Sequence, residues 1–127
     1  MKNMKTITAI VAIAGMVLVI TTHNGINGIS TYNATPLVLA LLPVLLLKSR
    51  ARERQFATLG FSFTAITLTI GYHLYWVMGG NSSSTGGIMF VFLPLYTVGL
   101  ACVGGAIGTA IGLIVEYQAR RRPNQAL

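Results

Sequence analysis

The side chains that could carry out chemistry in this chain are few. Its 127 residues include two carboxylates, Glu53 and Glu116, two histidines, His23 and His73, and one cysteine, Cys102. Enzymes that act on lipids or peptides need a nucleophile with a base, paired acids or a metal, and no such set stands out. A single cysteine also excludes an intrachain disulfide and a multi-cysteine metal site. We therefore expect no catalysis, no cofactor and no bound metal.

The two histidines are the most informative ionisable residues. His73 stands beside Tyr72, Tyr75 and Trp76 near the end of one apolar run, and His23 ends another. An ionisable group at membrane depth is a functional candidate, so a paired proton or metal site is one interpretation. Tyrosine and tryptophan at a helix end usually mark the lipid headgroup level, where histidine is tolerated. Two histidines are few ligands for a metal, and we expect simple interfacial placement.

The composition points to lipid as the surrounding solvent. Hydrophobic residues make up 54% of the chain and charged residues only 9%, whereas soluble domains carry about 25% charged residues. A net charge of +7 raises the question of a nucleic-acid partner, but no basic stripe interleaved with aromatic residues is present. The basic residues instead flank apolar runs, in three clusters: Lys2 and Lys5; Lys48, Arg50, Arg52 and Arg54; Arg120, Arg121 and Arg122. We assign them to membrane topology and expect no nucleic acid.

Four apolar runs predict four membrane helices, at about residues 6–22, 34–48, 56–78 and 88–116. About 20 helical residues span a hydrocarbon core of about 30 Å. The second run is marginal, because its strictly apolar part, Leu37–Leu47, is short and contains Pro43. A re-entrant hairpin is the alternative there. Pro36 suits a first helical turn, whereas Pro43 and Pro94 predict kinks.

The distribution of charge predicts the orientation. Lys48–Gln55 holds four basic residues, while His23–Asn33 and Gly79–Gly87 hold none. Because cytoplasmic loops collect lysine and arginine, the loop 48–55, the tail 117–127 and the N-terminus are all expected inside. A basic start and an apolar run also resemble a signal peptide, but no small-x-small cleavage site follows and we expect retention. The prediction is one all-α domain, an integral membrane four-helix bundle with both termini cytoplasmic.

The predicted fourth helix has a face of small residues, formed by Thr97, Ala101, Gly104, Gly108 and Gly112. Small residues let two helices approach closely in lipid, where dispersion and weak backbone contacts hold them together. One interpretation is a surface for a second copy or another membrane protein. The simpler interpretation is packing against the other helices of the same chain.

The predicted third helix carries a polar stripe of Thr58, Ser62, Thr69 and His73, with Ala65 among them. At about 100° per residue these positions share one face. Unpartnered polar groups are costly in hydrocarbon, so the stripe should face the bundle interior. It either lines a permeation path or forms hydrogen bonds, partly back to its own helix.

The segment Ser82–Tyr96 (SSSTGGIMFVFLPLY), followed by a glycine-rich helix with a basic end, resembles the carboxyl-terminal part of small four-helix bacterial inner-membrane proteins. The resemblance implies a bacterial inner membrane and no activity. Small multidrug-resistance exporters have a membrane-embedded glutamate in their first helix, and 6–22 here has none. The patterns of fluoride channels cannot be placed on this chain. Colicin immunity proteins are similar in architecture alone.

Two functions follow as hypotheses. The first is a non-enzymatic multi-pass inner-membrane protein that acts through helix packing, as an accessory or immunity-like subunit. The second is a small oligomeric channel or transporter lined by the polar stripe. The expected partners are the lipid bilayer and, through the fourth helix, a second copy or another membrane protein.

Overall fold

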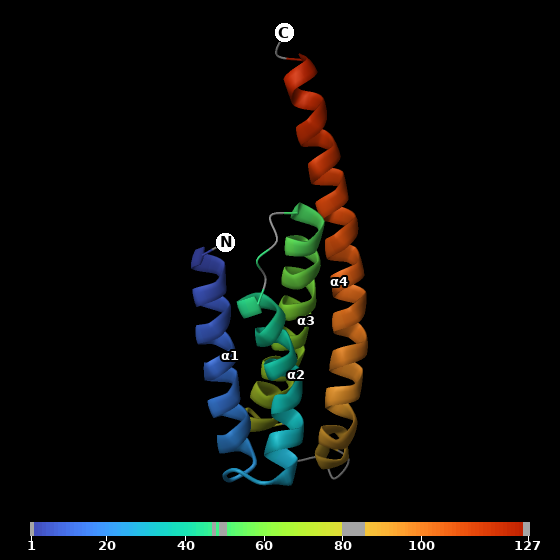
Figure 1. Ribbon diagram of the computed structural model, residues 1–127. Helices are drawn as coiled ribbons and strands as arrows, with labels where there is room; N and C mark the ends of the chain where they lie inside the picture. The colour runs from blue at the N-terminus through green and yellow to red at the C-terminus, as the bar shows by residue number, and fades with distance from the viewer. Residues whose placement is uncertain (1, 47, 49–50, 80–85, 126–127) are drawn as a thin grey trace.

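The computed structural model describes residues 2–46, 48, 51–79 and 86–125. The described chain forms α1 (Lys2–Thr22), α2 (Gly28–Leu46), α3 (Arg52–Val77) and α4 (Gly86–Gln125). The helices run alternately in opposite directions, so the start of α1 and the end of α4 lie toward the same end of the bundle (Figure 1). The protein is therefore an all-α packed four-helix arrangement.

The third helix is the centre of the bundle. It packs against all three other helices, and most extensively against α4, whereas α1 and α4 make no close approach within the described residues. Small side chains fill much of the interior, which brings the helix axes close together. The core contains Ala12, Val19, Leu37, Ala40, Ala65, Ile66 and Ala101.

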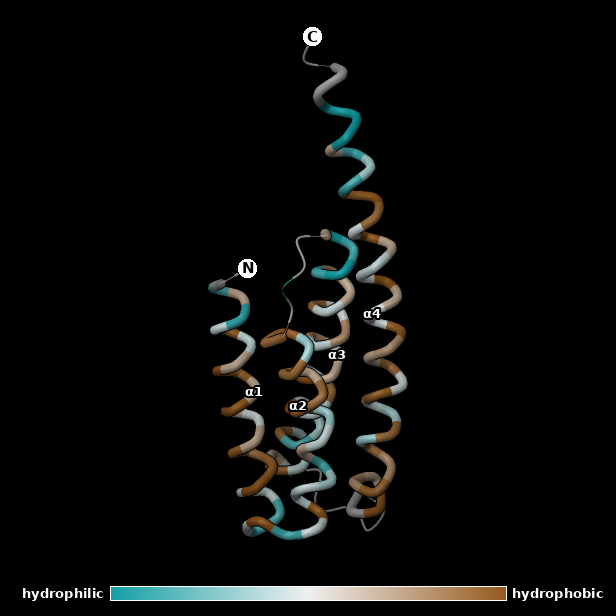
Figure 2. The backbone as a smooth tube through the Cα atoms, in the orientation of Figure 1, coloured by the Kyte–Doolittle hydropathy of each residue, from teal (hydrophilic) through white to brown (hydrophobic). Residues whose placement is uncertain are grey.

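Large apolar side chains point outward rather than inward. Ile10 on α1, Leu46 on α2, Phe63 on α3 and Leu95 on α4 are all exposed, and hydrophobic residues extend along the sides of the helices (Figure 2). Three segments are long and apolar enough to cross a membrane, namely Asn3–Thr22, Gly28–Leu46 and Ile88–Arg122. An exterior of this kind is stable in lipid and would aggregate in water.

The second helix begins at Gly28, earlier than the predicted residue 34. A reciprocal cap explains the earlier start. The Asn27 side-chain oxygen accepts a hydrogen bond from the Ser30 backbone N–H at 3.0 Å, and the Asn27 backbone N–H donates to the Ser30 hydroxyl at 2.8 Å. Pro36 consequently lies inside the helix and not in its first turn. The helix then continues to Leu46, so the re-entrant hairpin is wrong.

The other helices also extend beyond their predicted limits at the end of the bundle that holds both chain termini. The tail expected at 117–127 is helical to Gln125. Arg120 donates to the Glu116 carboxylate at 3.0 Å, and the Arg121 guanidinium lies 4.5 Å from the centre of the Tyr117 ring. Such pairs one turn apart stabilise an exposed helix. Residues 49 and 50 of the basic loop, and residue 47 of the predicted second helix, lie outside the described residues.

Pro94 lies within α4, as the sequence predicts, and α2 supports the adjacent turn. A proline has no N–H to donate to the carbonyl four residues earlier, which weakens that turn of the helix. The Tyr32 hydroxyl donates to the Val91 carbonyl at 2.8 Å. This bond joins α2 to α4 near the start of α4.

Candidate functional site

The small-residue face of α4 packs against α3 of the same chain. A methyl group built on Gly108 would collide with the Phe56 carbonyl, and one on Gly112 would lie 2.5 Å from the Glu53 Cα. These two helices therefore meet backbone to backbone, as small-x-x-x-small sequences allow. We call Gly60, Gly104, Gly108 and Gly112 the glycine seam, and the end of the bundle that contains it the glycine end.

Thr97 and Ala101 continue the same face and are fully buried. Gly104 is also closed off, because a methyl group there would collide with the Thr64 side chain and the Gly60 carbonyl. The surface that the sequence offers to a second copy or another protein is thus covered by α3.

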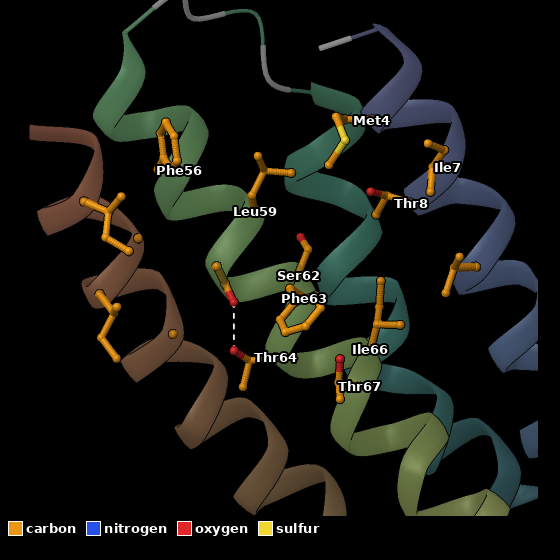
Figure 3. A pocket seen from close by; sticks show the side chains of 16 residues that line it. Met4, Ile7, Thr8, Phe56, Leu59, Ser62, Phe63, Thr64, Ile66 and Thr67 are labelled. Atoms are coloured by element: carbon orange, nitrogen blue, oxygen red, sulfur yellow. Dashed lines mark hydrogen bonds between the residues drawn. The ribbon is translucent and has the colours of Figure 1, made fainter. Parts of the chain in front are cut away.

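A lateral groove lies beside the glycine seam. Because α1 and α4 stand apart, part of α3 forms the floor of an apolar hollow of about 660 Å³ between them (Figure 3). Its walls include Ile7 on α1 and Ile107 on α4. On the floor, the Thr64 hydroxyl donates to the Gly60 carbonyl at 2.8 Å, so its own helix satisfies it.

The polar stripe of α3 faces the interior. Ser62, Ala65, Thr69 and His73 are buried, and Thr58 is half-buried. The Ser62 hydroxyl donates to the Ala40 carbonyl of α2 at 2.7 Å. The expected inward orientation is confirmed for the buried members, and one of them forms a hydrogen bond between helices.

Two sets of contacts fix the register of α2, α3 and α4 at one level of the bundle. Ser62 lies opposite Ala40 through its hydrogen bond, and Gly104 lies against Gly60 and Thr64, on either side of Ser62. Seven residues make about two helical turns. The third helix runs antiparallel to both α2 and α4. A step of seven residues forward on α3 therefore reaches the same level of the bundle as a step of seven residues backward on α2 or α4. Each step also returns to the same face of its helix.

That second level is occupied by Thr69 on α3, Asn33 on α2 and Thr97 on α4, which we call the polar layer. All three residues are fully buried. The Asn33 side-chain oxygen and the two threonine hydroxyls have no hydrogen-bond partner within the described part of the chain. Asn33 was predicted to lie in a loop and was therefore missed as a site residue; its polar side chain six residues after the Asn27 cap was the available signal.

The two histidines meet at the opposite end of the bundle, which we call the histidine end. The His23 Nε2 lies 3.3 Å from the His73 Nε2, and the His73 Nδ1–H donates to the Thr69 carbonyl at 2.7 Å. Because a carbonyl only accepts, His73 carries its proton on Nδ1 and, when neutral, presents a lone pair on Nε2. His73 is fully buried and His23 half-buried. Burial lowers the pKa of His23, which follows the last residue of α1.

Phe90 holds this pair in place. Its ring centre lies 4.6 Å from that of His23, 5.0 Å from that of His73 and 5.0 Å from that of Trp76, with Tyr72 at 5.1 Å. The contacts with His23, Tyr72 and Trp76 are edge-to-face and the one with His73 is tilted, and aromatic contacts of this kind favour particular ring orientations. The sequence predicted an aromatic cluster at this level from α3, but not the contribution of Phe90 from α4.

Within the described residues, no three side chains of histidine, cysteine, aspartate or glutamate gather closely enough to hold a metal. Comparison with protein-family models, curated proteins and solved structures finds no match for this chain. The segment Ser82–Tyr96, which carries the sequence resemblance, lies partly outside the described residues, so no family is assigned. The three apolar helices define the class, which is a multi-pass helical membrane protein.

Proposed function

We propose that the chain crosses a bacterial inner membrane four times, with both ends in the cytoplasm, and acts as an accessory or immunity-like subunit through helix contacts rather than catalysis. The single observation that carries this proposal is the lateral groove, an apolar hollow beside α3 that residues 2–46, 51–79 and 86–125 leave open. Its occupant in this proposal is one transmembrane helix of a partner membrane protein.

The fourth crossing rests on the position of α3. It contacts all three other helices, so a bilayer around α2 and α4 also surrounds it. The polar residues that make its sequence less apolar are turned inward, and its exposed side chains include Phe63 and Leu74. Inward polar groups and outward apolar groups suit a central membrane helix.

The orientation rests on charge. The starts of α1 and α3 and the end of α4 lie at the glycine end, and these segments carry Lys5, Arg52 and Arg120. The turn between α1 and α2, at the histidine end, contains no lysine or arginine. The positive-inside rule places the glycine end in the cytoplasm.

The groove suits a helix because its lining is almost entirely apolar. Ile7 and Ile107 supply its walls, and Leu59, Phe63 and Ile66 of α3 form part of its floor. Van der Waals packing drives helix association in lipid, and apolar side chains of a partner helix can provide it here. The basic glycine end favours a partner helix with acidic residues at its cytoplasmic end.

The test is co-purification of the full chain from membranes in mild detergent. Ile7→Trp should fill the groove and reduce recovery of a membrane partner about tenfold, whereas Ile10→Trp is the matched control on the same helix outside the groove. Both isoleucines are exposed, at 55% and 62%. A chain recovered alone in every case, or equal loss with both substitutions, would contradict the proposal.

The polar layer supports a second candidate, a small channel or transporter lined by the polar stripe. Its buried oxygens, which lack hydrogen-bond partners among the residues the structure describes, could replace part of the hydration shell of a passing solute or ion. Purified protein in liposomes should then conduct solute, and Ser62→Leu or Thr69→Leu should reduce the flux. Absence of flux under every imposed gradient would remove this candidate.

A further inference from the structure

We propose that His23 and His73 together bind one divalent transition-metal ion of the zinc class at the histidine end. The site is independent of the lateral groove, which lies at the glycine end. It is formed by the residue that follows α1 and by the last part of α3, two segments that are distant in the sequence and adjacent in the fold.

The separation of the two ring nitrogens suits a shared ion. Two zinc–nitrogen bonds of about 2.0–2.1 Å that meet at a tetrahedral angle separate the nitrogens by about 3.3–3.4 Å. The observed Nε2–Nε2 distance is 3.3 Å. In the absence of an ion, the same contact is a hydrogen bond from the His23 Nε2–H to the His73 Nε2 lone pair. The two nitrogens also lie at the spacing of two corners of a metal tetrahedron, so an ion would replace the proton between them.

The second nitrogen of His73 also suits metal binding. Metal-ligating histidines almost always donate their other ring N–H to a carbonyl or carboxylate, which fixes the tautomer and the ring. The His73 Nδ1–H donates to the Thr69 carbonyl at 2.7 Å, and this leaves the Nε2 lone pair directed at His23. A backbone carbonyl accepts a hydrogen bond but does not accept a proton. The contact therefore orients His73 and ends any proton relay there.

The surroundings complete the argument. Phe90 contacts both imidazole rings, so the two nitrogens are held in position before an ion arrives. Glu53 and Glu116 lie together at the glycine end, so neither carboxylate can serve as a ligand. Because His23 is half-buried, water from the outer face can fill the remaining coordination positions. Two neutral ligands give weaker binding than a closed four-ligand structural site.

The experiment uses the full chain without a histidine tag, labelled with nitrogen-15 in its histidines and titrated with Zn²⁺ in detergent micelles. The sequence contains only two histidines, so single substitutions assign every imidazole signal. We expect one Zn²⁺ per chain, a shift of the Nε2 signal of both residues, and an Nδ1 of His73 that stays protonated throughout. Co²⁺ in place of Zn²⁺ should give the intense visible absorption of a tetrahedral ion.

Variants separate this site from adventitious binding. His23→Gln should weaken Zn²⁺ binding by at least about tenfold, and it should fold because His23 lies in a half-buried turn. Tyr72→Phe is the matched control, since Tyr72 contacts the same Phe90 ring and supplies no metal ligand. Equal binding by the parent and His23→Gln, or a shift confined to one histidine, would overturn the proposal. An unchanged spectrum at a large excess of Zn²⁺ would do the same.

Discussion

The two ends of the α3–α4 pair are built on opposite principles. At the glycine end the helices touch through their backbones, because Gly108 and Gly112 leave no side chain between them and α3. At the histidine end the same two helices are separated by the Phe90 ring, which contacts His73 and Trp76. One end is closed by the absence of side chains, and the other is filled by large and polar ones.

A taper in α4 connects the two ends. Side chains on its buried face become steadily smaller along the chain, in the order Phe90, Leu93, Thr97, Ala101, Gly104, Gly108 and Gly112. The space between α3 and α4 therefore widens toward the histidine end, where Tyr32 of α2 bonds to α4. Close packing and polar chemistry occupy different ends of the bundle because a backbone-to-backbone contact leaves no room for functional groups.

The largest effect is expected from breaking the glycine end. Gly108→Leu should destabilise the bundle by about 3 kcal/mol, since the new side chain meets a backbone carbonyl that cannot rotate away. Gly99→Leu is the matched control on α4, because a Cβ at Gly99 meets nothing within 4 Å. Unfolding in mixed detergent micelles measures both, and similar stability of the two variants would contradict the taper.

A smaller pair of effects of opposite sign should distinguish the level of Ser62 from the polar layer. Ser62→Ala removes the hydrogen bond to Ala40 and should cost about 1 kcal/mol. Thr97→Val removes a buried hydroxyl without a described partner and should stabilise the bundle by about 1–2 kcal/mol. The same unfolding assay applies, and destabilisation by Thr97→Val would mean that its hydroxyl has a partner in the membrane.

The smallest effect is expected from pH at the histidine end. Burial lowers the pKa of His23 below its ordinary value of 6.5, so the unfolded chain binds this proton more readily than the folded one. The contribution of neutral His23 to the free energy of unfolding is fully present above pH 6.5. It is lost as the pH falls through that value toward the lower pKa of the folded state. Stability measured against pH should thus decline on the acid side, and the decline should be smaller in His23→Gln. Identical pH profiles would exclude a role for His23.

The sequence predicted the number of helices, their apolar exterior and the inward polar stripe. These properties follow from local rules, because apolar runs of sufficient length form helices in lipid and a helical projection shows which residues share a face. Ser62, Thr69 and His73 were placed in the interior on that basis. The limits of α2 were less accurate, because the cap between Asn27 and Ser30 lies in a polar segment that lacks apolar periodicity.

The contacts between helices could not be predicted from apolar runs and helical periodicity. The glycines of α4 suit either another subunit or α3, and the choice depends on which helix lies beside them in the fold. His23 and His73 are 50 positions apart, and Asn33, Thr69 and Thr97 lie on three different helices. One-dimensional periodicity states which face of a helix is polar or small. The partner across that face is fixed by the packing of the whole bundle, because the register between helices depends on every side chain in their interface.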